Sequence, residues 1–163
     1  MNNFQIIDYS NEYFQQLYEL QIQQWGEGSD SDEIFSHIDN YLIKLVLSKD
    51  LLVGCSICHI IDKKTLYLDM IVISPEFQNK GIGTKLLTNV IDYAKTNGFC
   101  SIECSAIEAN GHTNSKKLLE NFGFECIDSV DNYWGKLCPD FFCKECGQKP
   151  CVCTMHKYIK KLK

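Results

Sequence analysis

The 163-residue sequence contains no arginine, and all sixteen of its basic residues are lysines. Guanidinium groups clamp phosphates through two parallel hydrogen bonds, so any phosphate bound here must be held by lysine and by backbone N–H groups. The net charge is −5 at pH 7. Because nucleic acids and anionic membranes bind basic surfaces, this acidic balance argues against both as partners.

The sequence also lacks long hydrophobic runs. The first ten residues, MNNFQIIDYS, show no basic start followed by an apolar stretch, so we expect no signal peptide. No stretch has the length of a transmembrane helix. These absences predict a cytoplasmic protein with no membrane partner, and disulfides are rare in that compartment. The ten cysteines are therefore expected to be thiols or metal ligands.

Hydrophobic residues make up 45% of the chain, which is enough for one core, and we expect a single domain over residues 1–163. Hydrophobic periodicity predicts a mixed α/β order of elements. Helices are predicted at 11–25, 32–42, 81–97 and 113–122, and strands at 3–9, 43–48, 51–62, 64–74, 99–107, 124–135 and 154–162.

A glycine-containing turn, SPEFQNKGIGTKLL (74–87), connects a predicted strand to a predicted helix. Gly81 and Gly83 allow the backbone to turn tightly, so that several N–H groups and the helix N-terminus face one point. Such a point suits a pyrophosphate. The spacing matches neither a Walker A loop nor a dinucleotide fingerprint, whose third glycine is replaced by Leu86. A plain strand-to-helix turn would explain the two glycines equally well.

Residues 70–98 resemble the acetyl-CoA signature of the GNAT superfamily of N-acetyltransferases. The family pattern Q/R-x-x-G-x-G/A is matched by Gln78, Gly81 and Gly83, and SKKLLENFGFE (115–125) is similar to the family's later helix with its Gly-Phe pair. The resemblance runs from about residue 4 to residue 134, with 154–162 as the last strand. It implies a central, mostly antiparallel sheet flanked by helices, with acetyl-CoA as the cosubstrate.

The resemblance also implies which residues contact acetyl-CoA. One strand would bind the pantetheine arm through its backbone, the glycine turn would bind the pyrophosphate, and the start of the later helix would lie near the CoA arm. These residues are Ile71, Val72 and Ile73; Gln78, Asn79, Lys80, Gly81, Ile82, Gly83 and Thr84; and Asn114 or Ser115.

Transfer of an acetyl group to a primary amine requires a base, because a protonated amine has no lone pair. The candidates are Asp69, two residues before Ile71, and Glu103 on the strand expected across the cleft; a solvated strand residue is the alternative for each. Relatives often place a tyrosine acid in the later helix where this sequence has Leu119. Tyr133, expected on the neighbouring strand, is the candidate substitute.

The amine acceptor is expected beside the first two helices and the NYWG turn. An aromatic residue among acids suits a cationic amine, although a solvated acidic loop would look the same. The residues concerned are Trp25, Glu27, Asp30, Asp32 and Glu33. A polyamine, an aminoglycoside, an amino acid and a protein N-terminus all fit, so the partner is a small-molecule or peptide amine. A homodimer is one oligomeric state that the sequence allows.

Cysteines fall into two groups. Five lie in predicted strands, and among them Cys55 and Cys58 are expected in the core on opposite faces of one strand. The others lie in a cysteine-rich loop, 138–156, between the last two strands. Cys143, Cys146, Cys151 and Cys153 form a four-sulfur set typical of structural Zn²⁺, and Cys138 or His156 is an alternative ligand.

The leading hypothesis is an acetyl-CoA-dependent N-acetyltransferase with a structural zinc loop. An alternative is a CoA-binding domain without turnover, whose zinc loop binds a protein partner; Leu119 in place of tyrosine motivates it. A zinc-dependent nucleic-acid binder is disfavoured by the net charge of −5.

Overall fold

The computed structural model describes residues 3–163 and contains a single eight-stranded sheet in the order β1-β2-β3-β4-β5-β8-β7, with β6 paired to β5. β4 and β5 are parallel and the other neighbours are antiparallel. The predicted mixed α/β fold with a mostly antiparallel sheet is confirmed. The strands are β1 Phe4–Asp8, β2 Leu42–Ser48, β3 Leu51–Ile60, β4 Thr65–Ile73, β5 Ser101–Ala109, β6 His112–Thr113, β7 Glu125–Val130 and β8 Thr154–Lys161.

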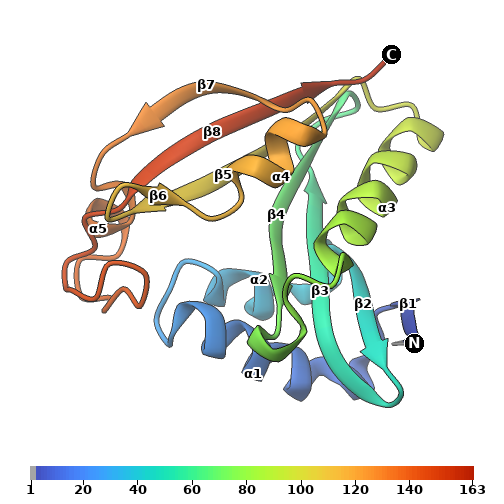
Figure 1. Ribbon diagram of the computed structural model, residues 1–163, viewed down its shortest axis with the longest axis horizontal. Coiled ribbons are helices and arrows are strands. Elements are labelled where there is room, and N and C mark those ends of the chain that lie inside the picture. Colours follow the sequence, from blue (N-terminus) through green and yellow to red (C-terminus); the bar gives the residue numbers. More distant parts are fainter. Residues whose placement is uncertain (1–2) are drawn as a thin grey trace.

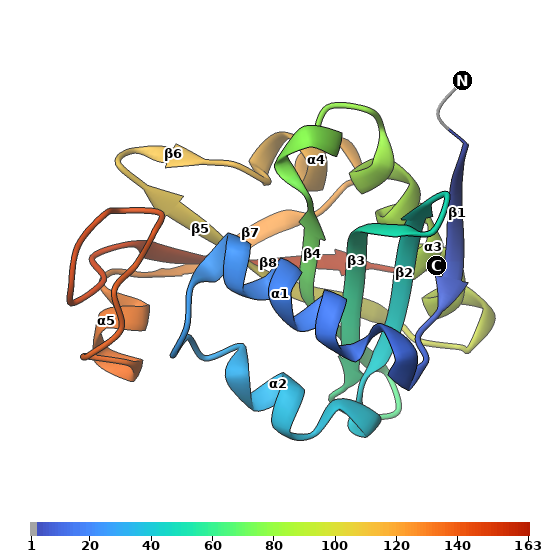
Figure 2. The same cartoon turned by 90° about the horizontal axis from the view of Figure 1, so that it is seen from below.

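Helices cover both faces of the sheet (Figure 1 and Figure 2). On one face, Leu17 and Leu20 of the first long helix pack in a buried cluster with strands β2, β3 and β4. On the other face, a second cluster joins β4, β5 and β8 to two later helices through residues such as Leu87 and Leu119. The helices are α1 Phe14–Trp25, α2 Asp32–Ser36, α3 Ile82–Thr96, α4 Lys116–Asn121 and α5 Tyr133–Leu137.

The two central strands diverge. The ladder between β4 and β5 ends at the pair Leu68 and Cys104, and Figure 1 shows the strands separating beyond it. A β-bulge lies at the same point, because Cys58 of β3 pairs with Leu68 while Ile57 pairs with Met70, which leaves Asp69 without a partner residue. Residues 69–73 therefore present one backbone edge that no strand of the described chain covers.

Two local predictions were wrong. The strand expected over 124–135 ends at Val130, because Asn132 adopts a left-handed conformation (φ 54°) and α5 begins at Tyr133. Tyr133 is therefore helical. The hairpin from β5 to β6 was not expected; its turn has positive φ at Asn110 and Gly111, which matches a type I′ turn.

The helix expected over 32–42 is also shorter than predicted, because α2 ends at Ser36 and a short 3-10 helix, Ile38–Asn40, follows. Two other expectations for the fold hold. Cys55 packs in the cluster beneath α1 and Cys58 in the cluster beneath α3, so they lie on opposite faces. The cysteine-rich loop connects α5 to β8 and therefore lies between the last two strands. Among residues 3–163, no helix is long and apolar enough to cross a membrane.

Candidate functional site

A cavity of about 820 Å³ fills the opening between β4 and β5. One end is formed by the glycine turn and the start of α3, and the other end by the α1–α2 segment and the cysteine-rich loop. Asp69 lies on β4 between these ends. The cavity thus joins an anion-binding end to an acidic and aromatic end.

The anion-binding end is the N-terminus of α3. Gly81 caps this helix with φ +79°, a conformation that side chains other than glycine rarely adopt. Lys85 donates the first intrahelical bond to the Gly81 carbonyl, so the N–H groups before it have no partner within the helix. Together with the helix dipole, these N–H groups form the kind of site that a phosphate occupies. The Gln78 amide holds the preceding loop against β4 by donating to the Ile73 carbonyl at 3.1 Å.

The structure brings all but one of the residues expected to contact acetyl-CoA to the cavity wall. The exception is Lys80, which is exposed and whose ammonium lies 5.0 Å from the centre of the Phe77 ring. The lining residues are Ile71, Val72, Ile73, Gln78, Asn79, Gly81, Ile82, Gly83, Thr84, Asn114 and Ser115.

Asp69 also lines the cavity, and its carboxylate is hydrogen-bonded to Nδ1 of His59 at 2.8 Å. Only 13% of the Asp69 side chain is exposed. Burial raises the pKa of Asp69, and the hydrogen bond from His59 offsets part of the shift. A carboxylate whose pKa is raised toward neutrality and which faces a cavity can accept a proton from an amine.

A hydroxyl pair lies on the wall beside Asp69. The Tyr67 hydroxyl is 2.7 Å from Oγ of Ser105, across the point where β4 and β5 diverge. Burial raises the pKa of Tyr67, so the phenol keeps its proton at neutral pH. Both residues line the cavity. Tyr67 can therefore act there as a hydrogen-bond donor.

Three other residues considered from the sequence take different places. Glu103 is absent from the cavity wall and forms an ion pair with Lys157 at 3.0 Å. Tyr133 is also absent from the wall, and its ring packs against Trp134 with centroids 5.1 Å apart. Leu119 does line the cavity, but it is buried and has no hydroxyl to donate.

The opposite end of the cavity is acidic and aromatic. Trp25, Asp30 and Glu33 of the residues predicted near the acceptor line it, whereas Glu27 and Asp32 do not. The Trp134 indole donates to Asp30 at 3.2 Å. Asp30 is open to solvent on one side, yet burial by the surrounding protein raises its pKa. Negative charge beside an indole is suited to binding a cation.

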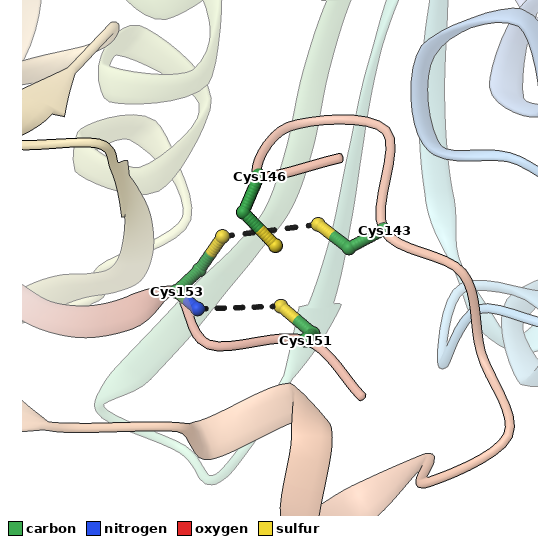
Figure 3. Close-up of side chains that lie close together, drawn as sticks. All are labelled: Cys143, Cys146, Cys151 and Cys153. Carbon is green, nitrogen blue, oxygen red and sulfur yellow. Dashed lines mark hydrogen bonds between the residues drawn. The ribbon is translucent and has the colours of Figure 1, made fainter. Parts of the chain in front are cut away.

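The four predicted cysteine ligands converge. Sγ atoms of Cys143, Cys146, Cys151 and Cys153 all lie within 4.8 Å of one another, and Figure 3 shows them pointing toward a common centre. A tetrahedral zinc site with Zn–S bonds of about 2.3 Å has sulfurs about 3.8 Å apart. The Cys143 and Cys153 sulfurs are 3.7 Å apart, far longer than a disulfide bond of about 2.05 Å. The donor set therefore fits Zn²⁺.

The alternative ligands lie elsewhere. Both ring nitrogens of His156 are engaged, Nδ1 with Ser129 at 2.6 Å and Nε2 with Glu108 at 2.5 Å. Cys138 lies outside the group of four sulfurs. Four thiolates would complete a zinc coordination sphere and leave no open position for catalysis.

Sequence reasoning missed His59 and Ser105. Each becomes visible only when the strands are aligned, because His59 pairs with Tyr67 across β3 and β4, and Ser105 follows the last β4–β5 pair. The hairpin turn at 61–64 could have indicated that His59 lies opposite Tyr67. No signal in the sequence locates the bulge at Asp69.

The site thus consists of two strands that diverge beside a helix N-terminus suited to an anion. The sequence matches the acetyltransferase (GNAT) family over residues 5–124. The chain belongs to this family.

Known proteins agree with this assignment. N-alpha-acetyltransferase 50 of Danio rerio is 29% identical over 102 residues, and the match spans 60% of each protein. A GNAT family acetyltransferase of Elizabethkingia anophelis, solved with acetyl-CoA bound, superposes with a TM-score of 0.77 at 21% identity, covering 99% of this chain and 100% of that one. Naa50 of Arabidopsis thaliana, solved with the bisubstrate analogue CoA-Ac-MVNAL, gives 0.75 at 19% identity over 98% and 99%.

Proposed function

We propose that this protein is an acetyl-CoA-dependent N-acetyltransferase that acetylates the primary amine of a small molecule or peptide. The observation that carries the proposal is the single cavity that joins the α3 N-terminus to Asp69 and to the acidic end. The family's match over residues 5–124 and the acetyl-CoA and CoA conjugates in structures of the same fold support it.

In this proposal the CoA pyrophosphate is held by backbone N–H groups at Gly81, Ile82 and Gly83, because the chain has no arginine to offer. The pantetheine arm pairs with the uncovered backbone edge of β4 around Ile71. Its thioester then lies at the point where β4 and β5 diverge. A backbone N–H of β4 stabilises the negative charge that develops on the thioester oxygen.

Asp69 is the proposed base. It takes the proton from the ammonium of the acceptor, directly or through a water, so that the nitrogen lone pair is free. The amine nitrogen forms a bond to the thioester carbonyl carbon, and the carbon–sulfur bond breaks with its electron pair on sulfur. The nitrogen then loses its second proton to the thiolate, so that the products are the amide and the CoA thiol. Tyr67 can donate a hydrogen bond to the leaving thiolate. A CoA thiol ionises near pH 8.5, so the thiolate is a good leaving group and the hydrogen bond from Tyr67 assists its departure without being essential.

The acceptor is proposed to be cationic. Asp30 and Glu33 surround the far end of the cavity together with Trp25 and Trp134. The Trp25 indole N–H is buried and has no hydrogen-bond partner within residues 3–163.

The four cysteines are proposed to hold a structural Zn²⁺. The loop around them carries few buried apolar groups apart from the cysteines themselves, and metal ligation supplies the folding energy that such a loop lacks. We place this metal outside the reaction, because four thiolate ligands saturate it.

Native mass spectrometry of freshly purified protein, with and without acetyl-CoA, tests the proposal. We expect a mass gain of one zinc per chain and a saturable acetyl-CoA adduct, followed by acetyl transfer in a screen of peptides and amines. Zinc without any acetyl-CoA adduct would contradict the transferase. Binding of acetyl-CoA without transfer across the whole screen would favour the non-catalytic, partner-binding alternative.

A further inference from the structure

The cysteine-rich loop is part of the cavity wall. Cys143, Cys151 and Cys153 line the same cavity as Asp69, and so do Lys144 and Glu145, which lie between the first two cysteines of the cluster. Figure 2 shows the loop beside the end of α1, although more than a hundred residues separate the two in sequence. The loop and α1 thus meet at the acidic end of the cavity.

Lys144 makes the central contact between them. Its ammonium donates to the carbonyl oxygens of Ile22 and Gln23 at 3.1 and 3.4 Å. These carbonyls lie in the last turn of α1, where the helix dipole is negative; the Ile22 carbonyl also accepts the backbone N–H of Gly26 at 2.8 Å. A lysine from a distant loop therefore caps the helix that borders the acceptor end.

Two further contacts fix the same junction. The Gln24 side-chain amide donates to the Glu145 carboxylate at 3.1 Å. Gly26, which ends α1, is buried against the loop: a methyl group there would lie 3.6 Å from the Lys144 side chain and 3.7 Å from the Phe141 ring. The loop therefore packs against the helix end in addition to hydrogen-bonding it.

A bound metal would restrain the segment that makes these contacts. Lys144 and Glu145 lie in the turn between Cys143 and Cys146, so four metal–sulfur bonds would hold that turn in one conformation. Without them, the turn retains only bonds such as Cys143 N–H to the Gln148 carbonyl at 3.1 Å. Ordering the Lys144 side chain would then have to overcome the entropy of a free loop.

We infer that the metal-held loop is the acceptor-side wall of the cavity, docked on α1 by Lys144 and Glu145, so that metal occupancy controls the acceptor end and leaves the acetyl-CoA end intact. The assignment of one end of the cavity to acetyl-CoA and of the other to the acceptor rests on the proposed acetyl transfer. The docking itself does not depend on it. The loop is then a specificity-determining segment, and Lys144 is a positioning residue.

Hydrogen–deuterium exchange with mass spectrometry tests the docking on the full chain, with acetyl-CoA titrated separately by calorimetry. After zinc is removed by a chelator, amides of residues 22–31 should exchange about tenfold faster or more, and those of 78–88 should not change. Lys144→Met should give the same local change while one zinc per chain is retained. Lys149→Met, at an exposed lysine of the same loop, is the matched control and should resemble the wild type.

Unchanged exchange of 22–31 after chelation or in Lys144→Met would overturn the inference. So would an equal increase at 78–88, because the loop would then support the whole domain and not one end. Failure of acetyl-CoA to bind the zinc-loaded protein would contradict the proposed function, but the exchange measurement would still test the docking. The two failures are therefore distinguishable.

Discussion

The Asp69 carboxylate lies 2.8 Å from Nδ1 of His59, and the two side chains border different cavities. Asp69 lines the large cavity, whereas His59 lines a second one of about 370 Å³ together with Tyr41 and His37. More than a third of the His59 side chain is exposed (37%), against 13% for Asp69. If Asp69 is the base, as proposed, this hydrogen bond offers its proton a path through His59 toward the second cavity.

The Asp69→Asn variant should lose activity and keep its cosubstrate. General base catalysis contributes about 10²–10⁴-fold, so we expect kcat to fall by about 100-fold or more with an unchanged Kd for acetyl-CoA. Asparagine retains the shape and one acceptor oxygen, so folding should be preserved. Steady-state kinetics and calorimetry measure the two quantities.

Two comparison variants sharpen this test. Asp92→Asn, at an exposed position of α3, controls for loss of surface charge and should be unaffected. Glu103→Gln breaks the ion pair with Lys157. If Glu103→Gln loses the rate and Asp69→Asn does not, Asp69 is not the base and the site must be reassigned.

Removing the His59 imidazole should shift the pH dependence of kcat/KM toward higher pH. The hydrogen bond and charge of His59 lower the pKa of Asp69 against the larger effect of burial, so His59→Leu should raise the pKa of Asp69 further. A base works when deprotonated, and kcat/KM rises with pH through its pKa. The acid limb of the kcat/KM profile should therefore move to higher pH in His59→Leu, with activity recovering on the alkaline side. A lowered plateau with an unmoved limb would mean that His59 has only a structural role.

The glycine turn and the four-cysteine set could be read from the sequence because each depends on local spacing. Gly81 needs a positive φ before a helix, and the cysteines lie within eleven residues, 143–153, so few conformations can keep them apart. The pairing of Asp69 with His59 could not be read in the same way. It depends on the register between β3 and β4, and register is a property of two strands together.

The predicted strand that contained Tyr133 was wrong although the sequence held a local signal against it. The run FECIDSVDNYWG has enough aromatic and apolar residues to look like one strand, but Asn132 adopts φ 54° and redirects the chain into α5. Asparagine is among the residues that tolerate this conformation, so the turn was a usable signal.

Glu103 lies on β5 as predicted, but its carboxylate pairs with Lys157 of the neighbouring strand β8. The sequence could not show this ion pair, because the pairing of β5 with β8 is non-local.

The proposed zinc site predicts a sharp difference between two single-cysteine variants. Cys146→Ser removes one of the four converging sulfurs, so zinc should be lost and the thermal midpoint should fall. Cys100→Ser, at an exposed cysteine outside the cluster, should keep one zinc per chain and the wild-type midpoint. A colorimetric zinc assay and differential scanning fluorimetry measure both. Equal behaviour of the two variants would contradict a zinc site made of these four sulfurs.

Gly135 provides a test of how α5 supports the cysteine-rich loop. A methyl group at this position would lie 2.1 Å from the Cys151 carbonyl oxygen, a distance that forces the backbone of either α5 or the loop to move. Overpacking of this kind costs about 1–3 kcal/mol, so Gly135→Ala should lower the thermal midpoint by roughly 2–4 °C for each kcal/mol in a chain of this size. Because the clash falls on Cys151, a proposed zinc ligand, zinc should also be released to a chelator faster than from the wild type. Lys136→Ala, the exposed neighbour in the same helix, should change neither quantity; if Gly135→Ala behaves like Lys136→Ala, then α5 does not hold the loop in place.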